Sequence, residues 1–122
     1  MTYEEKDLLL KDLCARLPYG VKVFYEYVDN LNKKTYGYSL TLNTWCIDEM
    51  KAEKAVVKPY LFPLSSMTEE QKKEYQYITE RWMYDSSYSI SDSIDWLNKN
   101  HFDFRNLIGR NLAIDCTNLN IY

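Results

Sequence analysis

Residues 57–78 constrain the fold of this chain more than any other stretch, because a β-type segment ends there and a strongly signalled helix begins. Pro59 and Pro63 fix φ at both ends of an apolar tripeptide and push the residues before them towards extended conformations. Thr68 and Gln71 have the spacing of a capping box, in which the hydroxyl accepts an early helix N–H and the glutamine reaches back. The sequence therefore predicts an extended segment followed by a helix that begins near residue 68.

The ends of this helix have further signals. Ser66 with Glu69 is a competing cap just before it, and residues 85–87 break the helical pattern at its end. The rest of the helix is mostly charged, so we expect it to lie on a sheet with most of its surface in water. Its apolar positions fall on one narrow stripe, formed by Tyr75, Ile78 and Trp82.

The N-terminal segment predicts an amphipathic helix over residues 3–16. Thr2 and Glu5 form another capping box, and Pro18 stops the helical pattern. Apolar residues recur at helical spacing between these two signals, so we expect the stripe to face the core. The stripe consists of Leu9, Leu10, Leu13, Cys14 and Leu17.

The C-terminal third predicts two further helices. Ser89 or Ser91 caps the first, which ends at residues 98–100. Asp103 caps a shorter one over residues 102–108, which Gly109 would close as a left-handed residue. In the first helix, the aligned apolar residues are Ile90, Ile94 and Leu97, with Trp96 beside them.

A period of two predicts a β-hairpin between residues 21 and 43, with a polar turn at 29–34. Residues 55–60 predict a third strand, and Pro59, which cannot donate to a ladder, places its end at a sheet edge. Residues 45–50 either extend the second strand or form a helical turn. The alternating apolar residues of the hairpin are Val21, Val23, Tyr25 and Tyr27, then Tyr36, Tyr38, Leu40 and Leu42; Leu112 and Ile114 indicate a last short strand.

These elements predict an α+β fold in a single domain, residues 1–122. We expect an N-terminal helix, a three-stranded antiparallel meander, two or three C-terminal helices and a short final strand. The pattern leaves open whether the meander curls into a small SH3-like barrel. No internal repeat, low-complexity tract or linker indicates a second domain.

Charge and composition argue against a polyanionic partner. The net charge is −3, and the nearest approach to a basic stripe is Lys51, Lys54 and Lys58. The 12 tyrosines supply apolar area with a hydroxyl that needs a partner or water, so many rings should lie at the margin of the core. The preferred interpretation is that they replace Phe and Leu in a small two-sided sheet, and the alternative is that some of them mark a contact surface.

The titratable residues give no catalytic or metal-binding pattern. Cys14, Cys46 and Cys116 are far apart and have no paired spacing, so they indicate structural thiols in a reducing compartment without a bound metal. His101 is the single histidine, and its pairing with a cysteine as a nucleophile is the least favoured reading. The glycines are isolated, so no phosphate loop and no cofactor are expected. No apolar run is long enough for a bilayer, and we expect a cytoplasmic protein.

Three blocks of sequence carry a resemblance. Residues 11–21, 57–71 and 100–115 resemble, in order, a widespread set of small uncharacterised proteins of gut Bacteroides and their phages or mobile elements. The blocks cover about a third of the chain, and the segments between them differ freely. The resemblance implies an intracellular accessory protein that binds a host or phage macromolecule, and it carries over no catalytic residue.

We therefore expect a non-enzymatic interaction module with a protein partner; a nucleic-acid-associated accessory protein is the alternative, and no pattern sets an oligomeric state. The predicted binding residues are Tyr19, Tyr60 and Phe62, because the two prolines pre-order the segment and reduce the entropy lost on binding. Strand alternation places Tyr60 and Phe62 on one side and Leu61 on the other. The competing interpretation has Tyr60 and Phe62 in the core, where the segment only anchors the helix that follows.

We predict no appreciable binding to random duplex DNA at physiological salt, because the chain is net negative and no helix carries a cationic stripe. Retention on a duplex-DNA column, measured over a range of salt concentrations, checks this. Salt-sensitive binding at micromolar concentration would contradict it.

Overall fold

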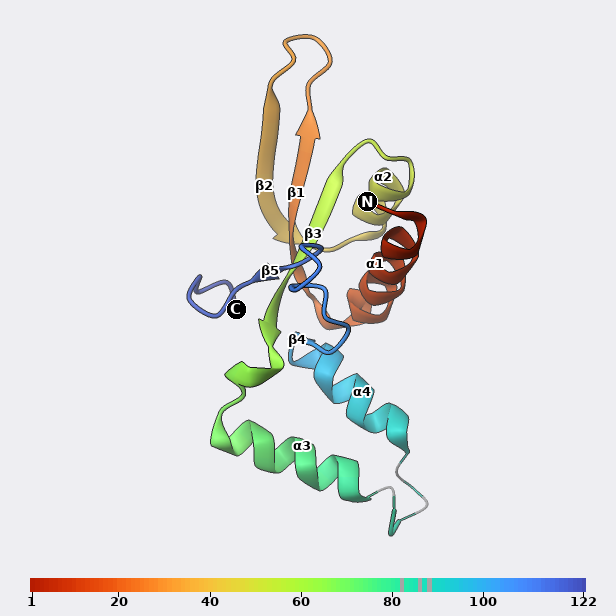
Figure 1. The fold of residues 1–122 in the computed structure, drawn as a ribbon, viewed down its shortest axis with the longest axis vertical. Helices are drawn as coiled ribbons and strands as arrows, with labels where there is room; N and C mark the ends of the chain where they lie inside the picture. The colour runs from red at the N-terminus through yellow and green to blue at the C-terminus, as the bar shows by residue number, and fades with distance from the viewer. Residues whose placement is uncertain (82, 86, 88) are drawn as a thin grey trace.

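The computed structural model describes residues 1–81, 83–85, 87 and 89–122, and it has an α+β architecture with one mixed sheet (Figure 1). The predicted N-terminal helix, hairpin, third strand and final strand all form. Residues 45–50, left undecided between strand and helix, lie in a helix that Asn43 caps by accepting a hydrogen bond from Cys46 N. The elements are α1 (Tyr3–Arg16), β1 (Lys22–Val28), β2 (Thr35–Thr41), α2 (Thr44–Lys51), β3 (Val56–Pro63), α3 (Glu69–Arg81), α4 (Ile90–Lys99), β4 (Phe102–Asp103) and β5 (Ile114–Asp115).

The sheet is open. Its strand order is β2-β1-β3-β4, with β5 also paired to β3. The β1 strand is antiparallel to β2 and β3, whereas β4 and β5 run parallel to β3. Within the described residues β2 pairs with β1 alone, so the sheet keeps a free outer edge. The alternative of an SH3-like barrel is therefore wrong, because closure would require β2 to pair with the opposite side of the sheet.

The β3 strand lies inside the sheet, so the prediction that Pro59 places the end of this strand at a sheet edge is wrong. Pro59 pairs with Val23 of β1, residues 60–61 pair with β5, and residues 62–63 pair with β4. The missing N–H of Pro59 is tolerated because ladder bonds in an antiparallel pair involve alternate residues. Leu42 N donates to Val21 O, so the odd residues of β1 bond β2 and its even residues bond β3. Pro59 lies opposite an odd residue and interrupts no bond.

The main core lies between the sheet and the two helices α1 and α2, which cover the same face (Figure 1). Val21, Val23 and Tyr25 of the first strand segment pack there, as their alternation predicts. Leu42 is also buried, but Tyr36 and Tyr38 of the same face are exposed. The other fully or largely buried members are Leu9, Leu13, Cys46, Ile47, Met50, Val57, Leu61, Leu107, Leu112 and Ala113.

The helices α3 and α4 pack on each other beyond the end of the sheet (Figure 1). The Thr68–Gln71 capping box is present, with Gln71 N to Thr68 Oγ1 at 3.1 Å and Thr68 N to Gln71 Oε1 at 2.9 Å. The expectation that α3 lies on the sheet is wrong, because Tyr75 and Ile78 pack against a second cluster formed by Trp96, Leu97 and Phe102. The third stripe residue, Trp82, lies outside the described residues.

The predicted stripe of α4 is wrong in part. Ser93, Trp96 and Leu97 are buried, whereas Ile90 and Ile94 are exposed. The indole Nε1 of Trp96 donates to Glu74 Oε1 of α3 at 3.0 Å, so the large ring determines which face turns inward.

Residues 102–108 do not form the predicted helix. Asp103 does cap a turn, since its carboxylate accepts from Leu107 N at 3.0 Å and from Ile108 N at 2.9 Å. The left-handed conformation expected at Gly109 occurs instead at Asn106 and Asn111, whose φ values are 57° and 59°. Asparagine tolerates this region better than other residues with a side chain, and two such residues divide the segment into turns.

The α1 helix buries an ionic network that its sequence pattern did not predict. Asp12 and Arg16 are fully buried, and Arg16 Nε donates to Asp12 Oδ2 at 2.9 Å. Arg105 Nη1 donates to Asp12 Oδ1 at 2.6 Å, and Arg16 Nη2 donates to Phe102 O at 2.6 Å. The stripe residue Cys14 is exposed, because the buried face of α1 runs through positions 9, 12, 13 and 16. The network ties α1 to the C-terminal segment.

Replacement of Asp12 with Asn should lower the free energy of unfolding by about 3–5 kcal/mol, because it leaves two guanidinium groups without their shared anion in a buried site. Urea unfolding at pH 7 measures the change. The matched control is Lys72→Gln, which breaks the exposed Lys72–Glu69 pair and should change stability by less than about 1 kcal/mol. An Asp12→Asn protein as stable as the control would contradict the assignment.

Candidate functional site

The β1–β2 hairpin and the start of α2 carry a row of aromatic rings, most of which are partly exposed. Figure 1 shows the hairpin extending past α2, so its distal half has no helix over it. The rings lie on the face that points towards α1 and α2. We call this set the hairpin aromatic surface; it consists of Tyr25, Tyr27, Tyr36, Tyr38 and Trp45.

Strand register brings these rings together. Tyr25 is opposite Tyr38 and Tyr27 is opposite Tyr36 in the antiparallel pairing, so all four side chains point to one face. The ring centroids are 5.5 Å apart for Tyr25–Tyr38 and 5.8 Å apart for Tyr27–Tyr36. Trp45, from the first turn of α2, stacks on Tyr25 at 5.0 Å. The rings therefore form one continuous ladder from α2 towards the tip of the hairpin.

Burial falls along this ladder. It does so across the pair of strands and not towards the tip: Tyr25 on β1 is buried, whereas Tyr38, directly opposite on β2, is 45% exposed. Burial raises the pKa of the Tyr25 hydroxyl, with a further contribution from the Glu49 carboxylate. Tyr36 and Trp45 are 40% and 47% exposed. Partly exposed tyrosine and tryptophan offer rigid apolar area together with a polar group, which is the chemistry enriched in protein-binding hot spots.

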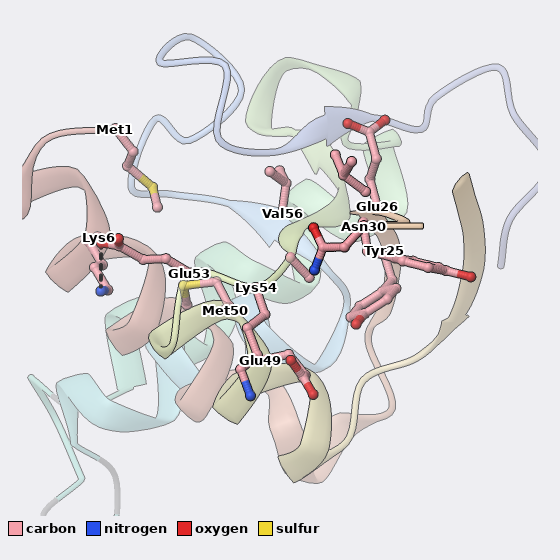
Figure 2. A pocket seen from close by; sticks show the side chains of 13 residues that line it. Met1, Lys6, Tyr25, Glu26, Asn30, Glu49, Met50, Glu53, Lys54 and Val56 are labelled. Carbon is pink, nitrogen blue, oxygen red and sulfur yellow. Dashed lines mark hydrogen bonds and ion pairs between the residues drawn. The ribbon is translucent and has the colours of Figure 1, made fainter. Parts of the chain in front are cut away.

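A hollow of about 940 Å³ adjoins the ladder between the distal part of β1 and the loop that joins α2 to β3 (Figure 2). Tyr25 and Tyr27 form part of its wall, and Met50, Ala55 and Val56 supply apolar surface opposite. Its charged side chains have both signs, and Lys6 pairs with Glu53 at 3.3 Å across one end. The charged residues around the hollow are Lys6, Glu26, Glu49, Glu53 and Lys54.

The structure separates the predicted binding residues from this surface. Tyr60 is only 6% exposed, and its hydroxyl is 2.7 Å from Ser39 Oγ on the far side of the sheet. Phe62 is half-buried, 6.0 Å from the Phe102 ring and 5.8 Å from the Tyr122 ring. Tyr19 is half-buried in the 3₁₀ turn Leu17–Tyr19. Leu61 is the residue of this segment that lies in the main core, and Tyr60 is covered on the opposite face, so the exposed Tyr60–Phe62 pair is not formed. A binding role for Tyr19, Tyr60 and Phe62 stays a prediction.

The sequence analysis expected many tyrosines at the margin of the core but did not single out Tyr36 and Tyr38. The alternation was correct, but the inner strand β1 is covered more fully than the outer strand β2, so Tyr25 is buried and Tyr38 opposite it is exposed. The signal that was present is the polar composition of the turn and the small or hydroxyl residues at alternate positions of β2. Such a strand has too little apolar material to be covered on both faces.

The environments of His101 and Cys116 are unsuited to nucleophilic chemistry. Burial, with a smaller contribution from the Arg16 charge, lowers the pKa of His101 to about 4, and burial raises the pKa of Cys116 to about 11. At neutral pH the imidazole is neutral and the Cys116 sulfur is a thiol, whereas a nucleophilic pair needs a thiolate. The His101 ring stacks on Tyr122 at 3.9 Å, which gives it a packing role. In the part of the chain that the structure describes, no three His, Cys, Asp or Glu side chains lie close enough to hold a metal ion.

Comparison with family models, curated proteins and solved structures found no match. None of the helices in the described ranges is long and apolar enough to cross a membrane.

The buried, neutral state of His101 should make the protein less stable in mild acid. The unfolded chain binds a proton near pH 6.5 and the folded chain only near pH 4, so the unfolding free energy falls as the pH drops through this window. Replacement with Asn, which tolerates the φ of 64° at this position, removes the effect.

Urea unfolding at pH 7 and pH 5 measures both proteins. Carboxylates titrate alike in the two, so wild type should lose more stability on acidification than the His101→Asn variant. An equal loss in both would show that His101 is not held neutral by the fold.

Proposed function

We propose that the chain is a non-enzymatic interaction module that binds a protein partner through the hairpin aromatic surface. The observation that carries the proposal is the ladder of Tyr25, Tyr27, Tyr36, Tyr38 and Trp45, which is partly exposed although it is continuous with the core. Rigid rings held by a paired hairpin lose little conformational entropy when a partner covers them. The adjoining hollow gives room for one larger side chain of the partner beside the ladder.

A protein partner fits the charges of this surface better than a nucleic acid. Single-stranded nucleic acid also stacks on aromatic rings, but its binding requires a basic groove along the backbone. Glu26, Glu49 and Glu53 surround the hollow together with only two lysines, and the chain is net negative. A phosphate backbone would therefore meet repulsion where a mixed-charge polypeptide would not.

The cellular setting of the proposal follows from the resemblance to small proteins of gut Bacteroides and their mobile elements. We place the protein in the cytoplasm as an accessory protein of a phage or mobile element whose target is a host or phage protein. The free thiols Cys14, Cys46 and Cys116 are compatible with a reducing compartment.

Replacement of Tyr36 and Tyr38 together with serine tests the proposal. Both rings are partly exposed, so the variant should stay folded and lose less than about 2 kcal/mol of stability from the two cross-strand pairs. Removal of two central anchors should weaken partner binding by about 30-fold or more, which corresponds to a loss of about 2 kcal/mol. The measurement is quantitative mass spectrometry of proteins that co-purify from the native host, followed by titration of the strongest candidate.

The matched control replaces Tyr77 and Tyr84 with serine, because these two tyrosines are exposed on α3 and on the turn after it, beyond the opposite end of the sheet from the hairpin. A partner that is lost from the hairpin variant and kept by the control supports the proposal. Equal retention by both variants, or capture that nuclease treatment abolishes, would contradict it.

A further inference from the structure

The outer edge of β2 is unpaired, and its free hydrogen-bonding groups can be assigned. Leu42 N donates to Val21 O at one end of the hairpin, and Asp29 N donates to Lys34 O at the other. Both bonds join residues that lie directly opposite each other in the antiparallel pairing, so these are hydrogen-bonded pairs. Ladder bonds alternate, so the even residues of β2 bond β1 and the odd residues point outward. The outward N–H and C=O groups belong to Thr35, Gly37, Ser39 and Thr41, and all four residues are exposed.

This edge lacks the features that keep sheet edges apart. Exposed edges in monomeric proteins carry lysine, proline, inward charges or bulges, or are covered by another segment. The seven residues of β2 include no charge and no proline, and each is matched to one residue of β1 in register without a bulge. Figure 1 shows no element beyond β2 on this side of the sheet. A seven-residue edge without charge, proline or bulge therefore resembles an edge that pairs with another strand.

We infer that β2 pairs with the β2 strand of a second copy of this chain, in an antiparallel arrangement about a two-fold axis through Tyr38. In this register the outward-pointing residues bond each other, Thr35 with Thr41 of the other copy and Gly37 with Ser39. Tyr38 faces Tyr38, and Tyr36 faces Leu40. Each pair is of a favourable type, namely hydroxyl with hydroxyl, small with small, or aromatic with aromatic or aliphatic.

The centre of the strand is shaped for this pairing. The ring of Phe24 lies across Gly37, where a Cβ atom would collide with the ring atom Cζ. The Phe24 ring thus occupies the position of the missing Gly37 side chain, while the N–H and C=O groups of Gly37 stay free at the edge. No like charges meet across the axis, although the chain as a whole is net negative. A second copy supplies the same uncharged, complementary edge, which a charged peptide would not.

The dimer extends the sheet and joins the two hairpin aromatic surfaces into one, with the two Tyr38 rings adjacent. The inference does not depend on the proposed partner, because it concerns the backbone edge of β2 and the proposed function concerns the rings on its face. One strand pair buries less than a standard interface, so we expect a Kd in the micromolar range.

Two charge variants test the pairing. In Thr35→Glu/Thr41→Glu, each glutamate meets a glutamate of the other copy, and the dimer should weaken at least 10-fold. In Thr35→Lys/Thr41→Glu, each lysine meets a glutamate, and dimerisation should be retained. The two variants share Thr41→Glu, which lies opposite Lys22 of the same chain, and differ only at position 35. Any effect of the glutamate on the stability of the single chain is therefore the same in both. Both leave the hairpin aromatic surface unchanged, so their result is separate from partner binding.

Sedimentation equilibrium over a range of concentrations measures the mass. Wild type should approach twice 14.6 kDa with rising concentration. A wild-type protein that stays monomeric at 1 mM, or a double-glutamate variant that dimerises as well as wild type, would overturn the inference. Amide hydrogen exchange of the wild type gives a second test that does not depend on whether the variants fold. The exchange of the N–H groups of Thr35, Gly37, Ser39 and Thr41 should slow as the protein concentration rises. Exchange rates that do not change with concentration would overturn the proposal.

Discussion

The carboxylate of Asp12 holds the two ends of this chain together. It accepts from Arg16 at 2.9 Å within α1 and from Arg105 at 2.6 Å in the C-terminal segment, while Arg16 reaches the carbonyl of Phe102 at 2.6 Å. Burial lowers the pKa of Arg16, and the Asp12 charge acts against this to keep the guanidinium protonated. A buried charge is costly without its partner, so the network forms only when α1 and β4 are in place. It therefore fixes where the C-terminal segment lies against β3.

The helices α1 and α2 cover the middle of the sheet, and the hairpin projects past them. An α2 of 8 residues is about 12 Å long, whereas the 7 residues of β2 extend for about 23 Å. The α3–α4 pair lies beyond the opposite end of the sheet. Tyr36 lies towards the tip, and Tyr38 lies on the outer strand opposite the buried Tyr25, so the helices cover neither ring fully. The two rings are exposed because the helices cover other parts of the sheet. Their aromatic side chains give the uncovered part of the hairpin a surface suited to binding.

Local signals in the sequence predicted the local structure well. The capping boxes at Thr2 and Thr68 and the alternation of the hairpin gave α1, α3 and the β1–β2 pair with close boundaries. Long-range placement could not be predicted in the same way. Pro59 indicated an edge by its missing N–H, but the ladder alternation that makes it harmless inside the sheet depends on the register with β1.

The candidate site was harder to predict than the fold. Tyr36 and Tyr38 have the same alternation as the buried Val23, and their place on the outer strand of the sheet distinguishes them. The local pattern gives no sign that Asp12 and Arg16 are buried, because charged residues of a helix usually face solvent. Arg105, which pairs with Asp12, is 93 residues away in sequence. In both cases the deciding information is which distant element covers a face, and no local pattern contains it.

The central claim is that the exposed face of the hairpin is the surface that meets other molecules. Photo-crosslinking in the native host tests it most directly, with a photoreactive phenylalanine analogue placed singly at Tyr36, Tyr77 or Tyr84. The account predicts discrete crosslinked products, including a partner protein, from position 36 and none of these from positions 77 and 84. Products from positions 77 or 84 with none from position 36 would contradict it.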